Sequence, residues 1–272
     1  MSYDTIEGSI EDGRPIYLYR FTLQQTVWRF TSRDRDYLDV DGMLWKSVAI
    51  SDDGPSYSGE ATTDMLTVTL PITAGPVQVH LNVPPASQIR LAILRANEGN
   101  TQRKVVYSGD VTQCSPAATG TATLSCETLT SSLAREGLRL GYQRSCPYAL
   151  YQASTCRVPM SAHEYTARVL DRSDYSLITD ITGITEGFFT GGLISWQHPV
   201  RGTEFRGVEE HGSNVLIILG RVDDIYPGLQ LKVYPGCNRT TDHCKNRFNN
   251  LSNMGGFPGM PGKSPFDGNP VF

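Results

Sequence analysis

The sequence predicts a mainly β protein with an N-terminal β domain, an irregular connector with short helices, and a small C-terminal β-barrel or sandwich that a cysteine-bound loop closes. Two observations lead to this fold class. Many short segments alternate apolar and polar residues with a period of two, and Gly, Pro and Asp clusters separate them. In the middle of the chain, Gly137, Gly141 and Pro147 interrupt every helical pattern. We therefore expect an N-terminal β domain over residues 1–136, followed by the connector, the small β domain and the C-terminal segment over residues 137–272.

The first domain begins with a predicted β-hairpin. Residues 15–23 alternate in character, and a second strand over residues 26–32 follows directly after Gln24 and Gln25. Residues 64–72 repeat the period of two, with apolar side chains on one face and threonines on the other. Further strands are expected over residues 87–97, 104–114 and 120–129, the first of these from an ambiguous pattern that favours a strand.

Beyond residue 129 the pattern changes twice. Residues 130–155 contain short helical pieces without a sustained apolar stripe. Six short strands then follow at a spacing of about ten residues, which is typical of a small barrel or sandwich. They are expected over residues 164–173, 175–182, 188–196, 204–212, 214–221 and 229–236.

The composition excludes several classes of protein. Of the 272 residues, 39% are hydrophobic and 19% are charged, as in an ordinary folded protein. The net charge of -4 provides no basic surface for nucleic acid. No apolar run approaches the roughly 18 residues of a membrane span, and the N-terminal residues do not resemble a secretory signal. We therefore expect synthesis in a reducing cytoplasm, where cysteines rarely form disulfides.

Four of the six cysteines lie in segments that are typical of loops. Nine residues separate Cys146 from Cys156 in the connector, and six separate Cys237 from Cys244 after the last strand. The spacing alone leaves four possibilities open: zinc, an iron–sulfur cluster, disulfides, or unrelated thiols buried as small hydrophobic residues. Zinc sites usually have two to four residues between paired ligands, so both spacings are wide for zinc.

Cys114 and Cys126 lie in predicted strands instead. Strands send their side chains to fixed faces, so we expect these two residues to have no ligand role. His243 precedes Cys244, where we expect its ring to support the loop or to face solvent rather than to replace a thiolate.

No pattern in the sequence predicts an enzyme. The five histidines are scattered, and the motifs Gly-x-Ser-x-Gly and His-Glu-x-x-His are absent. The Asp-rich residues 31–42 suggest a calcium loop at first sight. Tyr37 and Val48 occupy two of the positions where the loop needs oxygen ligands, so a polar loop between strands is the better prediction.

Four stretches of the chain together resemble a known protein family. They are residues 17–50, residues 131–156, the sequence GFFTGGLISW, and the closing sequence YPGCNRTTDHCKNRFNNLSNMGGFPGMPG. In this order they resemble the landmarks of the tail-tip, or baseplate hub, family of long-tailed siphophages and gene transfer agents, which includes the tail tip protein L of phage lambda. The resemblance extends over essentially the whole chain.

The resemblance implies a structural virion protein rather than an enzyme. Members of the family are made in the host cytoplasm and sit in the virion at the tail tip, typically as a homotrimer. Their partners are the distal tail protein, the central tip or fibre protein and the tape-measure protein, and their roles are tail assembly and host cell entry. Members of the lambda type hold a [4Fe-4S] cluster, and the matching cysteines here are Cys146, Cys156, Cys237 and Cys244, with zinc as the second choice.

One alternative belongs to another functional class. A cell-wall hydrolase or a sugar-binding module can also occupy a tail tip, with the cysteines binding zinc. Trp28, Trp45 and Trp196 would then form a stacking platform for sugars, although tryptophans beside strand residues more often belong to a core.

Overall fold

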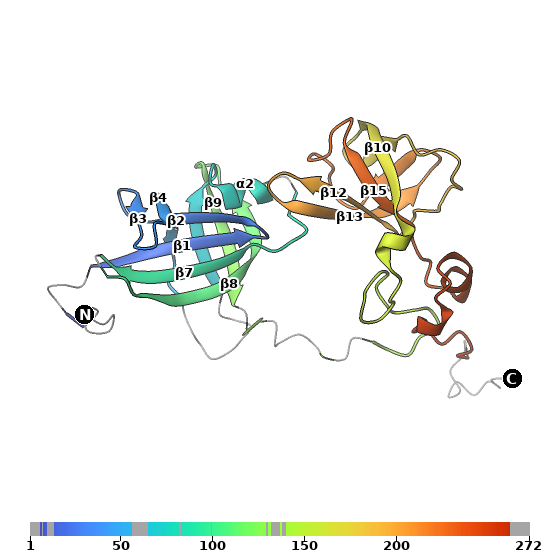
Figure 1. Ribbon diagram of the computed structural model, residues 1–272, viewed down its shortest axis with the longest axis horizontal. Helices are drawn as coiled ribbons and strands as arrows, with labels where there is room; N and C mark the ends of the chain where they lie inside the picture. The colour runs from blue at the N-terminus through green and yellow to red at the C-terminus, as the bar shows by residue number, and fades with distance from the viewer. Residues whose placement is uncertain are drawn as a thin grey trace. The chain divides into compact units, whose positions relative to one another are not determined.

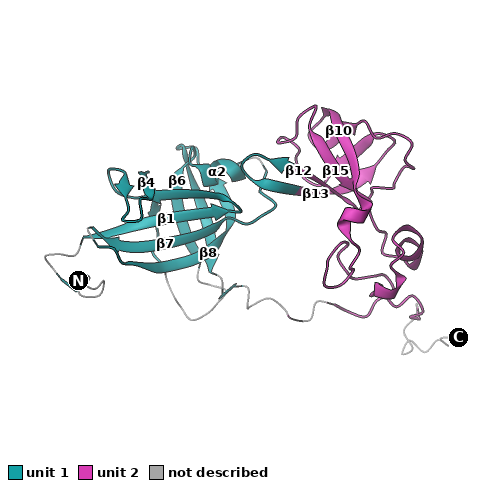
Figure 2. Ribbon diagram, viewed as in Figure 1, with its two compact units in different colours: residues 1–135, 197–204 teal, residues 136–196, 205–272 magenta. Residues whose placement is uncertain are grey.

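The computed structural model describes residues 6, 8, 9, 14–55, 65–81, 83–98, 100–128, 130, 131, 137 and 140–261. The chain divides into two compact units (Figure 2). Unit 1 comprises Met1–Arg135 and Gln197–Glu204, and unit 2 comprises Glu136–Trp196 and Phe205–Phe272. The predicted fold class, mainly β with a small C-terminal barrel, is confirmed. Among the described residues, no helix has the length and apolarity that crossing a membrane requires.

Unit 1 contains, in its described part, a nine-stranded sheet with the order β3-β4-β2-β1-β7-β8-β9-β6-β5 (Figure 1). Neighbouring strands are antiparallel, apart from the parallel pair β2 and β4. The expected hairpin is confirmed as β1 and β2, and the ambiguous segment over residues 87–97 is indeed a strand, β7. The strands are β1 (Pro15–Leu23), β2 (Thr26–Thr31), β3 (Tyr37–Leu38), β4 (Leu44–Ser47), β5 (Ser51–Asp52), β6 (Met65–Pro71), β7 (Arg90–Asn97), β8 (Arg103–Pro116) and β9 (Thr121–Thr128).

Strand β1 buries side chains on both faces of this sheet. Ile16 and Leu18 point to one face while Tyr19 and Phe21 point to the other, because successive side chains alternate across a strand. The first pair packs in a small cluster with Trp45, and the second pair packs in the main core of the unit. Strands β6 to β9 complete the main core, so one apolar interior holds most of the sheet together.

A short helix, α2 (Gly75–His80), covers part of the main core. Val77 and Val79 are buried there. A Cβ atom at Gly75 would overlap the indole ring of Trp28, so only glycine permits this close approach of helix and strand.

The Asp-rich segment forms the expected polar loop, which contains the two-residue strand β3. Asp39 is buried and forms an ion pair with Arg103, which also pairs with Asp41. The indole Nε1 of Trp45 donates to Asp39 Oδ2 over 3.4 Å. Asp39 and Asp41 therefore join this loop to β8 of unit 1 through Arg103.

Unit 2 is built on a closed barrel of six described strands in the order β10-β11-β14-β13-β12-β15 (Figure 1). Its interior is filled by aliphatic side chains together with Phe189 and Trp196. The strands are β10 (Tyr165–Arg172), β11 (Ser176–Thr179), β12 (Leu193–His198), β13 (Gly202–His211), β14 (Val215–Ile218) and β15 (Gln230–Tyr234).

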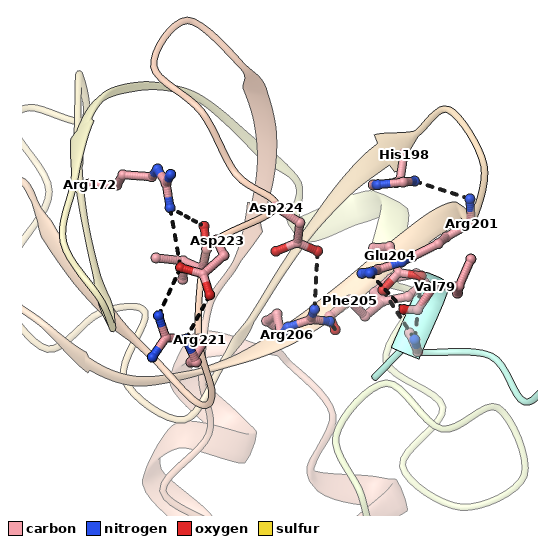
Figure 3. Close-up of polar contacts among 12 residues, drawn as sticks. Val79, Arg172, His198, Arg201, Glu204, Phe205, Arg206, Arg221, Asp223 and Asp224 are labelled. Carbon is pink, nitrogen blue, oxygen red and sulfur yellow. Dashed lines mark hydrogen bonds and ion pairs between the residues drawn. The ribbon is translucent and has the colours of Figure 1, made fainter. Parts of the chain in front are cut away.

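Figure 3 shows ion pairs of unit 2. Arg206 Nη2 lies 3.3 Å from Asp224 Oδ2, and both side chains are only 9% exposed. The same guanidinium lies 5.2 Å from the centre of the Trp196 ring, which is itself buried. On the surface, Asp223 pairs with Arg221 over 2.7 Å.

The boundary between the two units runs through the β12–β13 hairpin. The tip of this hairpin, Gln197–Glu204, belongs to unit 1. There Arg201 Nη2 donates to the carbonyl oxygen of Val79 over 2.8 Å, as Figure 3 shows, and Ala86 N donates to Glu204 Oε2 over 3.1 Å.

Two segments differ in detail from the expected elements. Residues 188–191 form turns rather than the beginning of a strand, because Gly191 has a φ of +73°, which ends an extended backbone. The described residues from 140 to 159 are irregular, with turns, and the 3-10 helix η2 (Met160–His163) follows them. Part of the expected connector, residues 132–136, 138 and 139, lies outside the described residues.

Candidate metal centre

The four loop cysteines line a single cavity in unit 2. Cys146, Cys156, Cys237 and Cys244 share a space of about 370 Å³ just beyond the end of β15. Its remaining wall is largely apolar and includes Tyr148, Leu150, Val158, Leu193 and Phe248. Residues more than eighty positions apart in the sequence are therefore brought to one site.

The other two cysteines lie where the sequence predicts. Cys114 is in β8 and Cys126 is in β9, both against the main core of unit 1. All six cysteines are free thiols in the structure.

The connector reaches the cavity by pairing with the C-terminal segment. Cys146 N donates to the carbonyl oxygen of Arg239 over 2.9 Å, and Phe257 N donates to the carbonyl oxygen of Gln143 over 2.9 Å. A Cβ at Gly256 would lie 2.7 Å from the carbonyl oxygen of Arg144. Glycine at this position is what lets the two chain segments lie against each other.

Sharp turns aim the cysteines into the cavity. The turn that contains Cys156 closes with a hydrogen bond of 2.9 Å from Arg157 N to the carbonyl oxygen of Gln152. Of the five non-glycine residues with positive φ in the described part of the chain, four lie in this site. They are Tyr151, Arg157, Arg239 and Asn249, with φ values of 65°, 60°, 63° and 47°. Such backbone conformations are uncommon and cluster at functional sites.

The loop from Cys237 to Cys244 is organised around its first thiol. Arg239 N lies 3.3 Å from Cys237 Sγ and donates to it. The ring of His243 accepts at Nδ1 from Asn238 N over 3.2 Å, which supports the loop as the sequence suggests for this residue. Cys244 lies in the short π-helix η3 (His243–Arg247).

Asn250 joins the two halves of the site. Its side-chain Nδ2 donates to the carbonyl oxygen of Cys156 over 2.5 Å, and its backbone N donates to the carbonyl oxygen of Cys244 over 2.8 Å. This residue lies just before the 3-10 helix η4 (Leu251–Asn253) and is only 8% exposed. The sequence analysis assigned it no role.

Protein groups also hold the C-terminal segment in place. The Arg247 guanidinium donates to the carbonyl oxygens of Phe188 and Gly236 over 3.0 and 2.8 Å. Tyr151 Oη donates to the carbonyl oxygen of Pro235 over 2.7 Å, and its ring meets that of Phe248 edge to face. The Gly- and Pro-rich segment is therefore packed through Arg247, Tyr151 and Phe248, which its composition does not indicate.

The environment keeps the two C-terminal thiols protonated in the absence of a bound cation. Burial raises the pKa of Cys237, and the neighbouring thiols raise it further, while the N–H of Arg239 opposes the shift. Burial also raises the pKa of Cys244, again with contributions from the other three cysteines of the cavity. Metal binding would replace these protons, because thiolates are the form that binds metals.

A single ion and a larger group place different demands on four thiolates. Four thiolates on one zinc ion, each about 2.3 Å from it, lie about 3.8 Å from one another. Among the described residues, no set of three or more Cys, His, Asp or Glu side chains converges closely enough to hold a metal ion. A [4Fe-4S] cluster binds each thiolate through a different iron, so its ligands stand farther apart around a larger body. The cavity of about 370 Å³ has four thiols in its wall, the donor set that either group requires.

The site contains residues that no sequence signal identified. Arg157 and Arg239 adopt positive φ, although their side chains give no preference for it. Tyr151 and Arg247 act through carbonyl oxygens that are close only in the folded chain. The adjacent asparagines Asn249 and Asn250 were the one available hint, since asparagine is among the residues that tolerate positive φ.

Comparison with known proteins gives three results. Residues 187–264 match the family model described as "Phage conserved hypothetical protein BR0599". An uncharacterized protein of Xylella fastidiosa (strain 9a5c) is 27% identical in an alignment of 184 residues that covers 62% of this chain and 38% of that protein, so the chain spans well under half the length of this relative. A chain from the structure titled "Virion of native gene transfer agent (GTA) particle" has the same fold, with a TM-score of 0.78 and 18% identity over 100% of this chain and 99% of that chain.

Proposed function

We propose that this chain is a structural component of a phage-like particle, located at the tail tip as a baseplate hub. In this role three copies connect the distal tail protein to the central tip or fibre protein. The observation that carries the proposal is the likeness of fold over the full length to a chain of a gene transfer agent virion. The match of residues 187–264 to a phage-conserved family supports it independently.

The four cysteines of the cavity are proposed to hold a structural [4Fe-4S] cluster. Such a cluster supplies four iron–thiolate bonds, which cross-link the connector, through Cys146 and Cys156, to the C-terminal segment, through Cys237 and Cys244. Two observations support a cluster rather than zinc: the four thiols line a space of about 370 Å³, and both sequence spacings of the cysteines are wide for zinc. The largely apolar wall limits access of water to the bound group.

The cluster acts as a staple rather than as a redox centre in this proposal. The C-terminal segment already packs through Arg247, Tyr151 and Phe248, so the cross-link adds stability to a segment that is partly ordered. A segment held at four points can keep a fixed surface during assembly with other tail proteins. The contribution of binding to stability follows from the coupling of metal binding to folding.

No observation favours the alternative of a hydrolase or a sugar-binding module. A platform for sugars needs exposed aromatic faces, yet Trp45 is 2% exposed and Trp196 is 3% exposed. Trp28 packs against the main core of unit 1 and the N-terminus of α2.

Electron microscopy of purified particles tests the proposed location. We expect density for this chain at the tail tip in three copies, between the tail tube and the central tip. Its absence from the particles, or its presence in the head or neck, would overturn the proposal.

Electron paramagnetic resonance tests the nature of the bound group separately. A reduced iron–sulfur cluster is paramagnetic, whereas zinc has a filled d shell and no redox chemistry. Protein purified without oxygen and then reduced should therefore give a signal. A silent sample that contains one zinc per chain would show that the staple is a zinc site.

A further inference from the structure

Asn250 is a buried asparagine whose side-chain polar atoms are all engaged within the candidate metal centre. Its Nδ2 lies 2.5 Å from the carbonyl oxygen of Cys156 and 3.9 Å from Cys156 Sγ. Its Oδ1 accepts from Asn253 Nδ2 over 2.6 Å, and this contact fixes which way the amide faces. The amino group of Asn250 is thereby directed at Cys156.

The backbone of Asn250 contacts a second cysteine. Its N–H donates to the carbonyl oxygen of Cys244 over 2.8 Å, a contact that does not depend on the protonation of the thiol. The Cys244 thiol also donates to the carbonyl oxygen of Asn250 over 3.2 Å, a hydrogen bond that a thiolate would lose. The preceding residue, Asn249, has a φ of 47°, which turns the chain back toward η3. One residue thus touches a cysteine from the connector and a cysteine from the C-terminal segment.

We propose that Asn250 is a positioning residue of the metal centre, which sets Cys156 relative to Cys244 and donates an N–H group to the sulfur of Cys156 when the centre is loaded. This inference rests on the proposed cluster. Groups that hydrogen-bond metal ligands fix the orientation of those ligands and commonly contribute 10- to 100-fold to metal retention. Hydrogen bonds to the sulfurs also raise the reduction potential of an iron–sulfur cluster, because they withdraw charge from the ligand.

An amide is the group that this position requires. A carboxylate of the same shape could only accept hydrogen bonds, so it would face the carbonyl oxygen and the sulfur of Cys156 without a proton between them. It would also place a negative charge beside the thiolates. Asn250→Asp therefore removes the N–H donor with almost no change in volume.

The test compares Asn250→Asp with the matched change Asn246→Asp in full-length protein purified without oxygen. Asn246 is exposed and does not line the cavity, and its Nδ2 donates to Asp242 over 2.6 Å. Asn246→Asp therefore controls for an added negative charge and for a weakened contact in the same segment. Two quantities are measured: the rate of iron release to a chelator and the midpoint reduction potential of the cluster that remains. A third variant, Asn250→Ser, keeps a small hydroxyl donor and serves if the Asp variant does not fold.

We expect Asn250→Asp to release iron about 10- to 100-fold faster than the wild type and to have a lower reduction potential, while Asn246→Asp changes both quantities much less. Asn250→Ser should fall between these two. Equal behaviour of the Asp variants at 250 and 246, or faster iron release with an unchanged potential, would overturn the assignment. Wild-type protein without iron would instead overturn the metal centre itself and this inference with it.

Discussion

Replacing Cys244 by Ser removes one thiolate of the proposed cluster and should loosen the C-terminal segment without unfolding the barrel. Serine is nearly the same size as cysteine but is a poor ligand for iron. Cys244 is buried, and its backbone N–H bonds the carbonyl oxygen of Thr240 over 3.1 Å, a contact that serine can keep. The change therefore tests the ligand role more than the packing role of this residue.

The size of the effect follows from the loop that the cluster closes. A cross-link from Cys156 to Cys237 spans about 80 residues along the chain, which corresponds to about 4.5 kcal/mol on the chain-entropy relation. However, Tyr165 of β10 already pairs with Val233 of β15, so the barrel closes most of that loop itself. About 13 residues remain for the cluster to constrain, which corresponds to about 3 kcal/mol.

Hydrogen exchange measures this local stability directly. Loss of about 3 kcal/mol corresponds to an increase of about 100-fold in the exchange rate of amides that exchange by local opening. We expect this increase for peptides that carry the amides of Cys146, Asn250 and Phe257, whose hydrogen bonds hold the segment in place. Amides of β10 and β15 should exchange at the wild-type rate.

Two results would refute this reasoning. Unchanged exchange around Asn250 in the Cys244→Ser protein would mean that no cluster holds the segment. Faster exchange of the segment and the barrel by the same factor would mean that the change destabilises unit 2 as a whole. Cys114→Ser is the matched control, because Cys114 lies in unit 1 and should leave the segment unaffected.

Three further predictions concern the packing of both units. Arg103→Leu should lower the free energy of unfolding of unit 1 in urea by about 3 kcal/mol, because it leaves the carboxylate of Asp39 buried without its partner. Gly256→Ala should separate the connector from the C-terminal segment and speed iron release to a chelator, whereas Gly259→Ala should not, since no atom lies within 4 Å of a Cβ there. Burial lowers the pKa of His211 in the folded protein. The unfolded state, with a pKa of about 6.5, therefore binds the proton first as the pH falls. The neutral His211 side chain contributes fully to the stability of unit 2 above pH about 6.5, and this contribution is lost below that pH. His211→Leu should flatten the urea stability profile between pH 7 and 5.

Each of these predictions has a contradicting outcome. Arg90→Leu removes an exposed ion pair with Asp110 and should lower the free energy of unfolding by less than about 1 kcal/mol. An equally small loss in Arg103→Leu would contradict the claim that burial makes the Asp39 pair important. Equal iron release by the two glycine variants would show that the contact at Gly256 does not position Cys146. An unchanged pH profile in His211→Leu would mean that other groups, such as Glu186, determine the acid sensitivity.

The strands were predictable because their signal is local. In β6, for example, Leu66, Val68 and Leu70 alternate with threonines, and each of these leucine and valine side chains is buried. The parallel pairing of β2 with β4 and the passage of the β12–β13 hairpin tip into unit 1 were not predictable, since both depend on contacts between residues far apart in the chain.

The candidate site was predictable only in its cysteines. Their position in loops marked out Cys146, Cys156, Cys237 and Cys244, and the structure brings all four to one cavity. That they bind a cluster stays a prediction. The groups that shape the cavity were missed because their partners are backbone carbonyl oxygens, which carry no sequence signal, as with Arg247 and Gly236.

The central claim is that the four cysteines of the cavity hold an iron–sulfur cluster, and quantitative iron, sulfide and zinc analysis of protein purified without oxygen tests it most directly. The wild type and Cys114→Ser should contain about four irons and four sulfides per chain, as a [4Fe-4S] cluster requires. Each Ser variant at Cys146, Cys156, Cys237 or Cys244 should have lost most of both. One zinc per chain in the wild type, or full iron and sulfide in the Cys146→Ser protein, would contradict the account.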